Sequence, residues 1–449
     1  MIRGIAKRVV CLLLAALLAA GVSGCIGTDN TVSLPAADLA GPRLLVIAPH
    51  PDDETVGTGG AIALARQRGW DVTVVFVTSG DGFWQAVRRR GGPMPSPAQM
   101  QAYGASRVAE ARRATAALGV PQRNVIFLGF PDGSTHFLWG TNWDGPALLG
   151  RNGARKVPYS FAFRPGAPYI GAELEGELEQ IVKRARPTTV LLPDAADVHR
   201  DHWAAGAFTQ MALVRSGYSG LALTYLVHRA GFPARRGSQP GQLLGAPSAL
   251  LRTGTHWLSL PVSDSARQAQ AAALADYASQ LRSDGPLLRS FVRPNEVLGM
   301  GPSAFVGTGT VALLEGSHDP VFRGGQPSAT LRAIDLSRGD ASATVTLQLA
   351  APVKPSVAYA LHVRTFGPGG RVRFYDALVS GGRLSATRTS KESVAGKGDL
   401  LAFGGDSLRV KLPSELLGGA QWLFVGADTY SGLLTADHAA WRLVRVLPR

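Results

Sequence analysis

A chain of 449 residues is too long for one ordinary hydrophobic core, so a large domain with a smaller second domain is expected. With 45% apolar and only 17% charged residues, the composition excludes a chain that is disordered throughout. The formal charge of +14 would suit either an anionic envelope surface or glycan as partner, or solubility alone. No nucleic-acid-binding module is evident, so nucleic acid is not expected as a partner, and the sequence points to no protein partner.

The first segment is typical of a secretory signal. Basic residues precede an apolar run at 9–20, which is too short to cross a bilayer core of about 30 Å. The following "VSGC", Val22–Cys25, resembles a bacterial lipobox, in which the cysteine is lipidated and becomes the new N-terminus. We therefore expect a lipoprotein signal peptide at 1–24, lipidation of Cys25, a tether at 25–42 and a membrane-anchored location in the cell envelope, periplasmic or at the cell surface. Cleavage to a soluble secreted protein is the alternative.

After the tether, strand-like and helix-like patterns alternate. Buried-strand runs are predicted at 43–49, 71–80, 124–130, 188–193 and 221–227, with helices at 57–69, 99–120, around 174–186, from about 203, and at 265–281. This alternation predicts an α/β fold with a Rossmann-like, doubly wound, mostly parallel sheet covered on both faces, in a domain spanning 43–310.

Past about residue 310 the helical spacing gives way to short alternating runs. In "ATVTLQLA", Val345, Leu347 and Leu349 share one face and polar residues occupy the other. Several similar runs follow, with Gly, Pro and Asp turns between them. The pattern predicts an all-β, sandwich-like accessory domain at 320–449.

The stretch "HPDDE", His50 to Glu54, directly follows the first predicted strand. In an open α/β sheet, ligands bind beyond the carboxyl ends of the strands. Three carboxylates so close together repel one another unless a cation neutralises them, so a divalent metal is expected here. Capping of a helix N-terminus is the structural alternative, and we assign that role to Glu54.

A second cluster, "HRDH", follows a later strand and ends where a helix should begin. His199 and His202 are three residues apart, so both rings can face one side. Two imidazoles and one carboxylate around an open position are typical of catalytic zinc, with His50, Asp53 and His202 as a candidate triad, although other divalent ions accept the same ligands. Asp52 and Asp53 are neighbours in a segment predicted to be extended, so one can hold the metal while the other acts as general base. Spacing alone does not decide which.

Together with "LGFPDG" between them, "PHPDDE" and "HRDH" resemble the PIG-L family of zinc-dependent N-deacetylases, also called LmbE-like. The similarity runs from about Arg43 to Gly299. It implies an enzyme that hydrolyses the N-acetyl amide of an N-acetylglucosamine-type sugar, giving free amine and acetate. An acetylated amino-sugar glycan of the envelope or the extracellular space would be the substrate, and Zn²⁺ the cofactor.

The resemblance also assigns the centre of the site. It makes His50, Asp53 and His202 the metal ligands and Asp52 the base that activates water. This division is physically sensible, because a metal ion polarises the amide while a separate carboxylate accepts the proton.

Further roles follow from the same resemblance. His199 would steady the oxyanion or protonate the leaving amine, with Asp201 orienting its ring. Arg107 and Asp132 match positions that hold sugar hydroxyls. One departure concerns Asp197, which stands where some members have a tyrosine, so help from a tyrosine hydroxyl is not expected.

Two other functional classes were weighed. A nucleotide-dependent enzyme would use "GTGG", but Ile62 stands where the phosphate-binding fingerprint needs a glycine, and the acidic run before it would repel pyrophosphate. A catalytically silent glycan-binding lipoprotein would use the β-domain, which could instead serve only for packing or spacing.

Residues outside the motifs receive structural interpretations or stay open. The aromatic side chains of the long stretch from His136 to Ile170 could stack on sugar rings or pack the stretch onto its own domain. His136 itself is expected at the surface, and His228 is expected to be structural because it has no partner at ligand spacing.

Overall fold

The computed structural model describes residues 32–33, 39–91, 94–301, 304–315, 326–339, 342–367, 370–388 and 390–448. The expected signal peptide, the lipidation site Cys25 and most of the expected tether lie outside these residues. Thr31–Arg449 forms one compact unit. Within the described ranges, no helix combines the length and the apolar character needed to cross a membrane.

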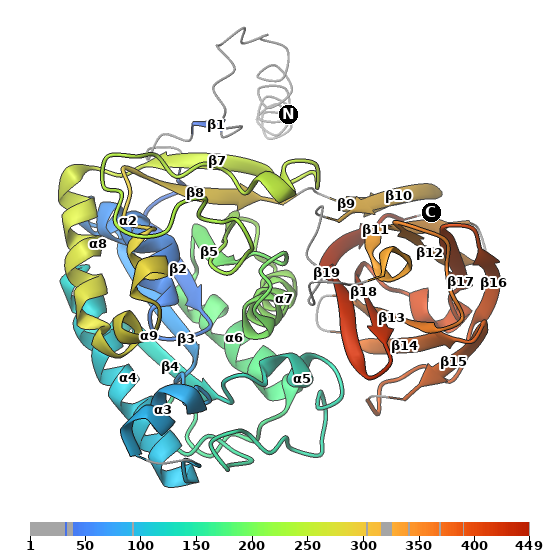
Figure 1. Cartoon of the computed structure of the whole chain (residues 1–449), viewed down its shortest axis with the longest axis horizontal. Helices are drawn as coiled ribbons and strands as arrows, with labels where there is room; N and C mark the ends of the chain where they lie inside the picture. Colours follow the sequence, from blue (N-terminus) through green and yellow to red (C-terminus); the bar gives the residue numbers. More distant parts are fainter. Residues whose placement is uncertain are drawn as a thin grey trace, which may run out of the picture. The chain divides into compact units, whose positions relative to one another are not determined.

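The first half of the described chain is built on one eight-stranded sheet with the order β1-β7-β8-β6-β5-β2-β3-β4 (Figure 1). The block from β6 to β4 is parallel, whereas β8 is antiparallel to both β6 and β7. The strands are β1 (Val32–Ser33), β2 (Arg43–Ala48), β3 (Asp71–Thr78), β4 (Val125–Phe130), β5 (Thr189–Pro193), β6 (Leu221–Tyr225), β7 (His256–Pro261) and β8 (Asn295–Met300). The prediction of a mostly parallel α/β sheet is confirmed.

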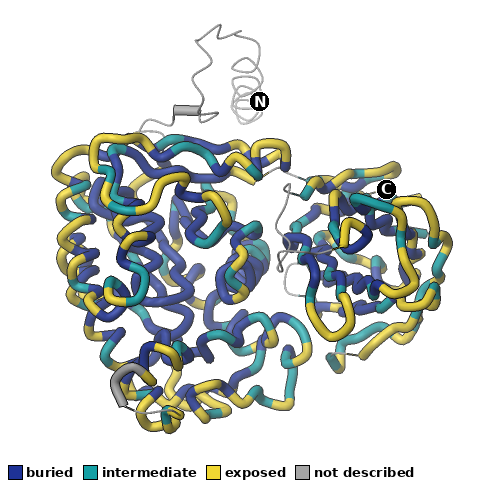
Figure 2. Tube along the Cα trace, viewed as in Figure 1, coloured by how far each residue is buried: buried dark blue, intermediate teal, exposed yellow. Residues whose placement is uncertain are grey.

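Helices cover both faces of this sheet, and the side-chain alternation of β2 shows why. Leu44 and Val46 pack in a core with α2, α4 and α8, whereas Leu45 and Ile47 pack in a second core with α6 and α7. Successive residues of a strand point to opposite faces, so a strand that is apolar throughout is covered on both sides. Figure 2 shows these central strands as buried. The helices are α2 (Asp53–Gln67), α3 (Trp84–Gly91), α4 (Pro97–Ala117), α5 (Thr135–Trp139), α6 (Gly171–Ala185), α7 (Arg200–Arg215), α8 (Asp264–Asp276) and α9 (Ala278–Arg289).

Two helices begin earlier than their sequence patterns indicate. Helix α2 begins at Asp53 rather than near Gly57, and α7 begins at Arg200 rather than near Trp203. The expectation that Asp52 and Asp53 lie in an extended segment is therefore wrong, because Asp53 is already in the first helical turn. Acidic residues suit that position, since the amide groups of a helix N-terminus favour negative charge.

The order of the parallel strands creates a crevice at one edge of the sheet. From the central strand β2 the chain moves outward through β3 and β4, then returns to the other side of β2 with β5 and β6. The loops that follow β2 and β5 thus diverge, which is where open α/β sheets bind their ligands. Both sequence motifs, at 50–54 and 199–202, follow these two strands.

The second half of the chain forms two packed sheets. Their orders are β10-β11-β12-β17-β16 and β15-β14-β13-β18-β19-β9. Val345, Leu347 and Leu349 are buried as their alternation predicts, in a core shared with β13 and β18, although Thr346 is buried too. The strands are β9 (Ala304–Val306), β10 (Gly309–Leu314), β11 (Leu331–Arg338), β12 (Ala343–Leu349), β13 (Val357–Phe366), β14 (Arg373–Ser380), β15 (Arg383–Thr387), β16 (Asp399–Gly404), β17 (Ser407–Lys411), β18 (Trp422–Ser431) and β19 (Leu434–Val446).

An aromatic core joins this β-sandwich to the α/β sheet. The ring of Trp139, at the end of α5, lies 5.0 Å from that of Phe208 on α7, 5.1 Å from that of Phe424 and 5.5 Å from that of Trp441. Trp139 is buried, as is Trp143. These two aromatic residues of the long stretch after α5 therefore pack against the β-sandwich and are not free platforms for a sugar.

A chain of ion pairs crosses the face of the six-stranded sheet that is turned toward the α/β domain. His362 Nδ1 lies 2.6 Å from Asp376 Oδ1, His362 Nε2 lies 3.2 Å from Asp428 Oδ2, and Asp428 Oδ1 lies 2.8 Å from His438 Nδ1. Arg364 Nη1 also contacts Asp376 Oδ1, at 2.8 Å. Burial alone would lower the pKa of His362, but the two carboxylates outweigh it and raise the pKa to about 9.

This shift predicts a pH-dependent contribution to stability. Because the pKa of His362 is higher in the folded than in the unfolded protein, the contribution is fully present below about pH 6.5 and is lost as the pH rises through about 9. It amounts to at most about 3 kcal/mol. We expect urea denaturation to show that His362→Gln costs more at pH 6 than at pH 10. An equal cost at both pH values, or the same trend for the exposed His256→Gln, would contradict this origin.

Candidate metal centre and active site

The loop after β2 is a tight turn that aims two acidic side chains differently. Asp52 is the N-cap of α2 and has φ 135°, a conformation that residues other than glycine rarely adopt. Asp53 follows in the helix, and its carboxylate accepts a hydrogen bond of 2.9 Å from the backbone N–H of His50. This hydrogen bond fixes the turn, while the carboxylate of Asp52 contacts Arg107 instead.

Three side-chain atoms from the two motifs form a small triangle. His50 Nδ1 and His202 Nε2 each lie 3.1 Å from Asp53 Oδ2, and the two nitrogens are 3.3 Å apart. Ligands about 2.05 Å from a tetrahedral zinc ion would lie about 3.3 Å from one another. All three side chains are buried. The donor set and its spacing therefore fit a divalent ion, and these residues would hold it.

The remaining ring nitrogens of both histidines contact carboxylates. His202 Nδ1 lies 3.0 Å from Asp197 Oδ2, and His50 Nε2 lies 3.1 Å from Asp132 Oδ1 and 3.2 Å from Asp201 Oδ2. Metal-binding histidines usually have such a partner, which fixes the ring orientation and tautomer. Both rings are thus held in place from behind.

The same contacts shift the protonation of the cluster. Burial would lower the pKa of His202, but Asp197 and Asp53 outweigh it and raise the pKa to about 10. Burial would raise the pKa of Asp53, and the positive His202 ring reverses this and lowers it. Since an imidazole must be neutral to bind a metal, a bound cation would take the place of the proton between these groups.

Asp197 is the anchor of His202, with Oδ2 at 3.0 Å from the ring Nδ1. Besides the ion pair, its carboxylate accepts hydrogen bonds from the backbone N–H groups of His199 at 2.8 Å, Val227 at 3.1 Å and His228 at 3.0 Å. These bonds hold the carboxylate rigidly between the loops after β5 and β6. Burial would raise its pKa, but His202 outweighs burial and lowers it.

Asp197→Asn is expected to weaken zinc binding about 10- to 100-fold, because the ring of His202 loses its charged partner. Competition with a chromophoric zinc chelator measures the change. Asp194→Asn is the matched control: this residue follows the same strand, but its carboxylate contacts Thr224 and the backbone of Ala196. Equal zinc affinities in both variants would show that Asp197 does not support the ligand.

Asp52 lies beside the triangle with a different partner. Its Oδ1 accepts a bond of 3.2 Å from Arg107 Nη2, and the same nitrogen donates to the backbone oxygen of Pro51 at 2.6 Å. Burial raises the pKa of Asp52 to about 8 even though Arg107 opposes the shift. A metal cation nearby would stabilise the carboxylate form. The structure thus gives Arg107 a contact with Asp52, while its expected contact with sugar hydroxyls stays a prediction.

His199 and Asp201 both lie within the cluster. The ring of His199 is 4.8 Å from that of His50 and 5.0 Å from that of His202, and its Nδ1 accepts the backbone N–H of Asp201 at 3.3 Å. Burial and the positive charge of His50 and His202 lower the pKa of His199 to about 3. The carboxylate of Asp201 accepts the N–H groups of Gly133 at 2.5 Å and Thr135 at 2.9 Å. Its expected role in orienting His199 stays a prediction.

Asp132 is brought to the same place by the loop after β4. Its Oδ2 accepts the backbone N–H of Gly82 at 2.7 Å, while Oδ1 faces His50. Burial would raise the pKa of Asp132, but the positive His50 ring outweighs it and lowers the pKa. Asp132 thus ties the loops after β3 and β4 to the centre, and its contact with a substrate hydroxyl stays a prediction.

Sequence reasoning missed two residues of this region. The ring of His228 lies 4.7 Å from that of His202, and one of its nitrogens is within 4.8 Å of the ligand atoms of Asp53 and His202. Asp81 is buried and accepts hydrogen bonds from Tyr159 Oη at 2.5 Å and Asn152 Nδ2 at 2.7 Å. Both residues stand just beyond the carboxyl end of a parallel strand, β6 or β3, and this position was the available signal.

Comparison with known proteins places the site within a family. Residues 45–213 match the PIG-L family model, described as GlcNAc-PI de-N-acetylase. A 1D-myo-inositol 2-acetamido-2-deoxy-alpha-D-glucopyranoside deacetylase of Tsukamurella paurometabola is 35% identical over 189 residues, which are 40% of this chain and 57% of that protein. A protein of the same description, numbered 1, from Saccharopolyspora erythraea is 34% identical over 182 residues, which are 39% and 55% of the two chains.

Among solved structures, N,N'-diacetylchitobiose deacetylase from Pyrococcus horikoshii is 18% identical with a TM-score of 0.36, over 58% of this chain and 84% of that one. The chain spans little more than half the length of the curated relatives it matches. The predicted catalytic, metal-binding and substrate-binding residues, from His50 to His202, all fall within the matched segment. The chain therefore carries a PIG-L family domain at residues 45–213.

Proposed function

We propose that this protein is a zinc-dependent N-deacetylase that hydrolyses the N-acetyl amide of an N-acetylglucosamine-type sugar in an envelope or extracellular glycan. The observation that carries the proposal is the triangle of His50 Nδ1, Asp53 Oδ2 and His202 Nε2, with the carboxylate of Asp52 beside it. The PIG-L match and relatives described as acetamido-sugar deacetylases support the same reaction class. Zinc is proposed because two imidazoles and one carboxylate suit it, although cobalt or iron would accept these ligands.

Each residue of the site has a separate role in amide hydrolysis. A divalent ion held by the triangle would supply Lewis acidity, which polarises the acetamide carbonyl and acidifies a water. Asp52 takes the proton from the attacking water, and Arg107 keeps that carboxylate in place. His199 stabilises the developing oxyanion or delivers a proton to the amine as it leaves, since an unprotonated amine leaves poorly.

Acetate release tests this function. Zinc-loaded mature protein should release acetate from N-acetylglucosamine or its oligomers, and a chelator should abolish the release until zinc is restored. A protein that retains zinc but hydrolyses no acetylated amino sugar would contradict the proposal. Binding of the same sugars without hydrolysis would favour the alternative of a catalytically silent glycan-binding lipoprotein.

The proposed location follows from the lipobox resemblance at Val22–Cys25. Cys25→Ser should move the protein from the membrane fraction to the soluble fraction of cells, because a lipid chain needs a cysteine thiol. Fractionation with detergent phase partition measures the shift. If both forms stay in the membrane fraction, Cys25 is not the anchor. If both are found in the soluble fraction, cleavage to a soluble secreted form is favoured.

A further inference from the structure

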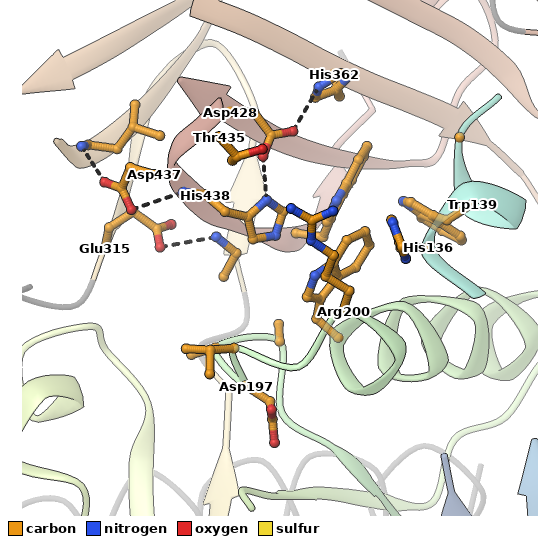
Figure 3. Close-up of a pocket in the computed structure, with 18 of the residues that line it drawn as sticks. His136, Trp139, Asp197, Arg200, Glu315, His362, Asp428, Thr435, Asp437 and His438 are labelled. Carbon is orange, nitrogen blue, oxygen red and sulfur yellow. Dashed lines mark hydrogen bonds and ion pairs between the residues drawn. The ribbon is translucent and has the colours of Figure 1, made fainter. Parts of the chain in front are cut away.

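A cavity of about 280 Å³ lies where the β-sandwich meets the α/β domain. A protein cavity of about 150 Å³ can bind benzene, so this one has room for one small ring. In Figure 3, Glu315, His362, Asp428, Thr435, Asp437 and His438 line it from the β-sandwich, and His136, Trp139, Asp197 and Arg200 line it from the α/β domain. Neither domain could form this cavity alone.

The cavity borders the candidate active site through a shared loop. Asp197 lines the cavity and also holds His202 Nδ1 at 3.0 Å. Val198 and Arg200 line it as well, and they flank His199, with Cα atoms about 3.8 Å from that of His199. A molecule in the cavity is therefore separated from the metal centre by the width of one loop.

The walls contain aromatic rings that pack on one another and buried polar atoms that lack a hydrogen-bond partner. Trp203 stacks on His438 with ring centroids 4.9 Å apart, and Trp441 lies 6.3 Å from Trp203. Within the described residues, both ring nitrogens of His136, Trp139 Nε1 and His438 Nε2 are buried without a hydrogen-bond partner. Leaving such atoms unpaired costs about 1–3 kcal/mol each, so a ligand or water is expected to pair them. His136 is half-buried here, so it is less exposed than expected for a surface histidine.

The charged groups of the cavity are largely neutralised by one another. His362 and Arg364 pair with Asp376, and His362 and His438 pair with Asp428, at distances of 2.6–3.2 Å. Among the other charged residues of the lining, Arg200 and Arg229 stand against Glu315 and Asp437, so neither sign of charge dominates to attract a strongly ionic ligand. An apolar aromatic wall combined with donors and acceptors that are already charge-balanced suits a neutral ring rich in hydroxyl groups.

We propose that this interdomain cavity is a second carbohydrate subsite, which binds an uncharged sugar ring of the same glycan whose acetamide is hydrolysed at the metal centre. The inference rests on the proposed function and deepens it. It gives the β-sandwich a part in substrate selection, because a chain of linked sugars would occupy both places and a single sugar only one. Longer substrates are therefore preferred.

Kinetics with substrates of increasing length test the subsite. The kcat/KM for acetate release from N-acetylglucosamine and its dimer, trimer and tetramer should rise with length in the unaltered protein. The ratio of tetramer to monomer should fall about 3- to 10-fold in His438→Gln, the worth of one hydrogen bond. Tyr430→Phe, which removes only a hydroxyl from the cavity wall, should lower the ratio in the same direction. His256→Gln, exposed on β7, should keep the original ratio.

The outcomes separate the two proposals. One outcome is that the monomer is hydrolysed but neither His438→Gln nor Tyr430→Phe changes the tetramer-to-monomer ratio of kcat/KM. This would overturn the subsite and leave the deacetylase function standing. Absence of any hydrolysis would overturn the function, and calorimetric titration of the zinc-loaded protein with the tetramer then decides the subsite. Weaker binding in His438→Gln than in His256→Gln supports it, whereas equal affinities or no binding refute it.

Discussion

Asp52→Asn is expected to lower kcat for deacetylation about 10²- to 10⁴-fold, the usual contribution of a positioned general base. In the unaltered protein Arg107 Nη2 donates to Asp52 Oδ1 at 3.2 Å, and the side-chain amide of asparagine keeps an oxygen that can accept this hydrogen bond. The amide cannot, however, take a proton from water. Zinc binding should persist, because the ligand atoms belong to His50, Asp53 and His202. Steady-state acetate release and zinc titration of the same preparation measure both quantities.

The control for this variant is Asp264→Asn, which removes an exposed carboxylate, paired with Arg267, from the first turn of α8. It should retain full activity. A loss of zinc together with the loss of activity in Asp52→Asn would show that Asp52, not Asp53, is the carboxylate ligand. Retained activity with bound zinc would exclude Asp52 as the base.

His202→Gln is expected to weaken zinc binding more than Asp197→Asn does, that is, by more than about 10- to 100-fold. The reason is that it removes a metal ligand, whereas Asp197→Asn removes only the partner of that ligand. Acetate release should fall to background. Glutamine keeps an N–H donor for the buried Asp197, whose carboxylate also keeps its three backbone hydrogen bonds. Chelator competition and thermal unfolding therefore distinguish loss of metal from loss of fold.

His256→Gln is the matched control, since it makes the same chemical change at an exposed position on β7. If His202→Gln binds zinc as tightly as this control, the ion lies elsewhere. His50 with Asp132 and Asp201 is the competing group, because its three ligand atoms also lie within 4.8 Å of one another. Asp132→Asn would then be the variant that loses zinc.

The metal triangle could be predicted from sequence because its parts lie in short motifs at strand ends. "HPDDE" and "HRDH" follow β2 and β5, and adjacent parallel strands bring their carboxyl ends together. The contacts behind the ligands could not be predicted. Asp132 and Asp201 meet His50 only through folding, across separations that no local spacing reveals.

The start of α2 shows a second limit of periodicity. Asp53 and Glu54 are polar, so an apolar pattern does not mark them as helical, yet Glu54 is fully buried and bonded to Tyr277 Oη at 2.6 Å. A buried acid in a first helical turn is set by tertiary partners, which propensity does not register. Its pKa is raised to about 7, chiefly by burial.

In the β-sandwich, too, the local pattern predicts the strands but not their tertiary contacts. Alternating Val345, Leu347 and Leu349 predicted a half-buried strand, because a period of two identifies the apolar face. The pattern does not say which domain packs against the other face of a sheet. The aromatic contacts of Trp139 with Phe424 and Trp441, and the cavity beside them, are consequences of tertiary structure alone.

The central claim is that His50, Asp53 and His202 jointly hold one divalent ion beside Asp52. Crystals of the zinc-loaded protein, measured on both sides of the zinc absorption edge, test it most directly. We expect a single strong anomalous peak about 2.0–2.2 Å from His50 Nδ1, Asp53 Oδ2 and His202 Nε2. A peak on other residues, or none at this place in a zinc-saturated crystal, would contradict it.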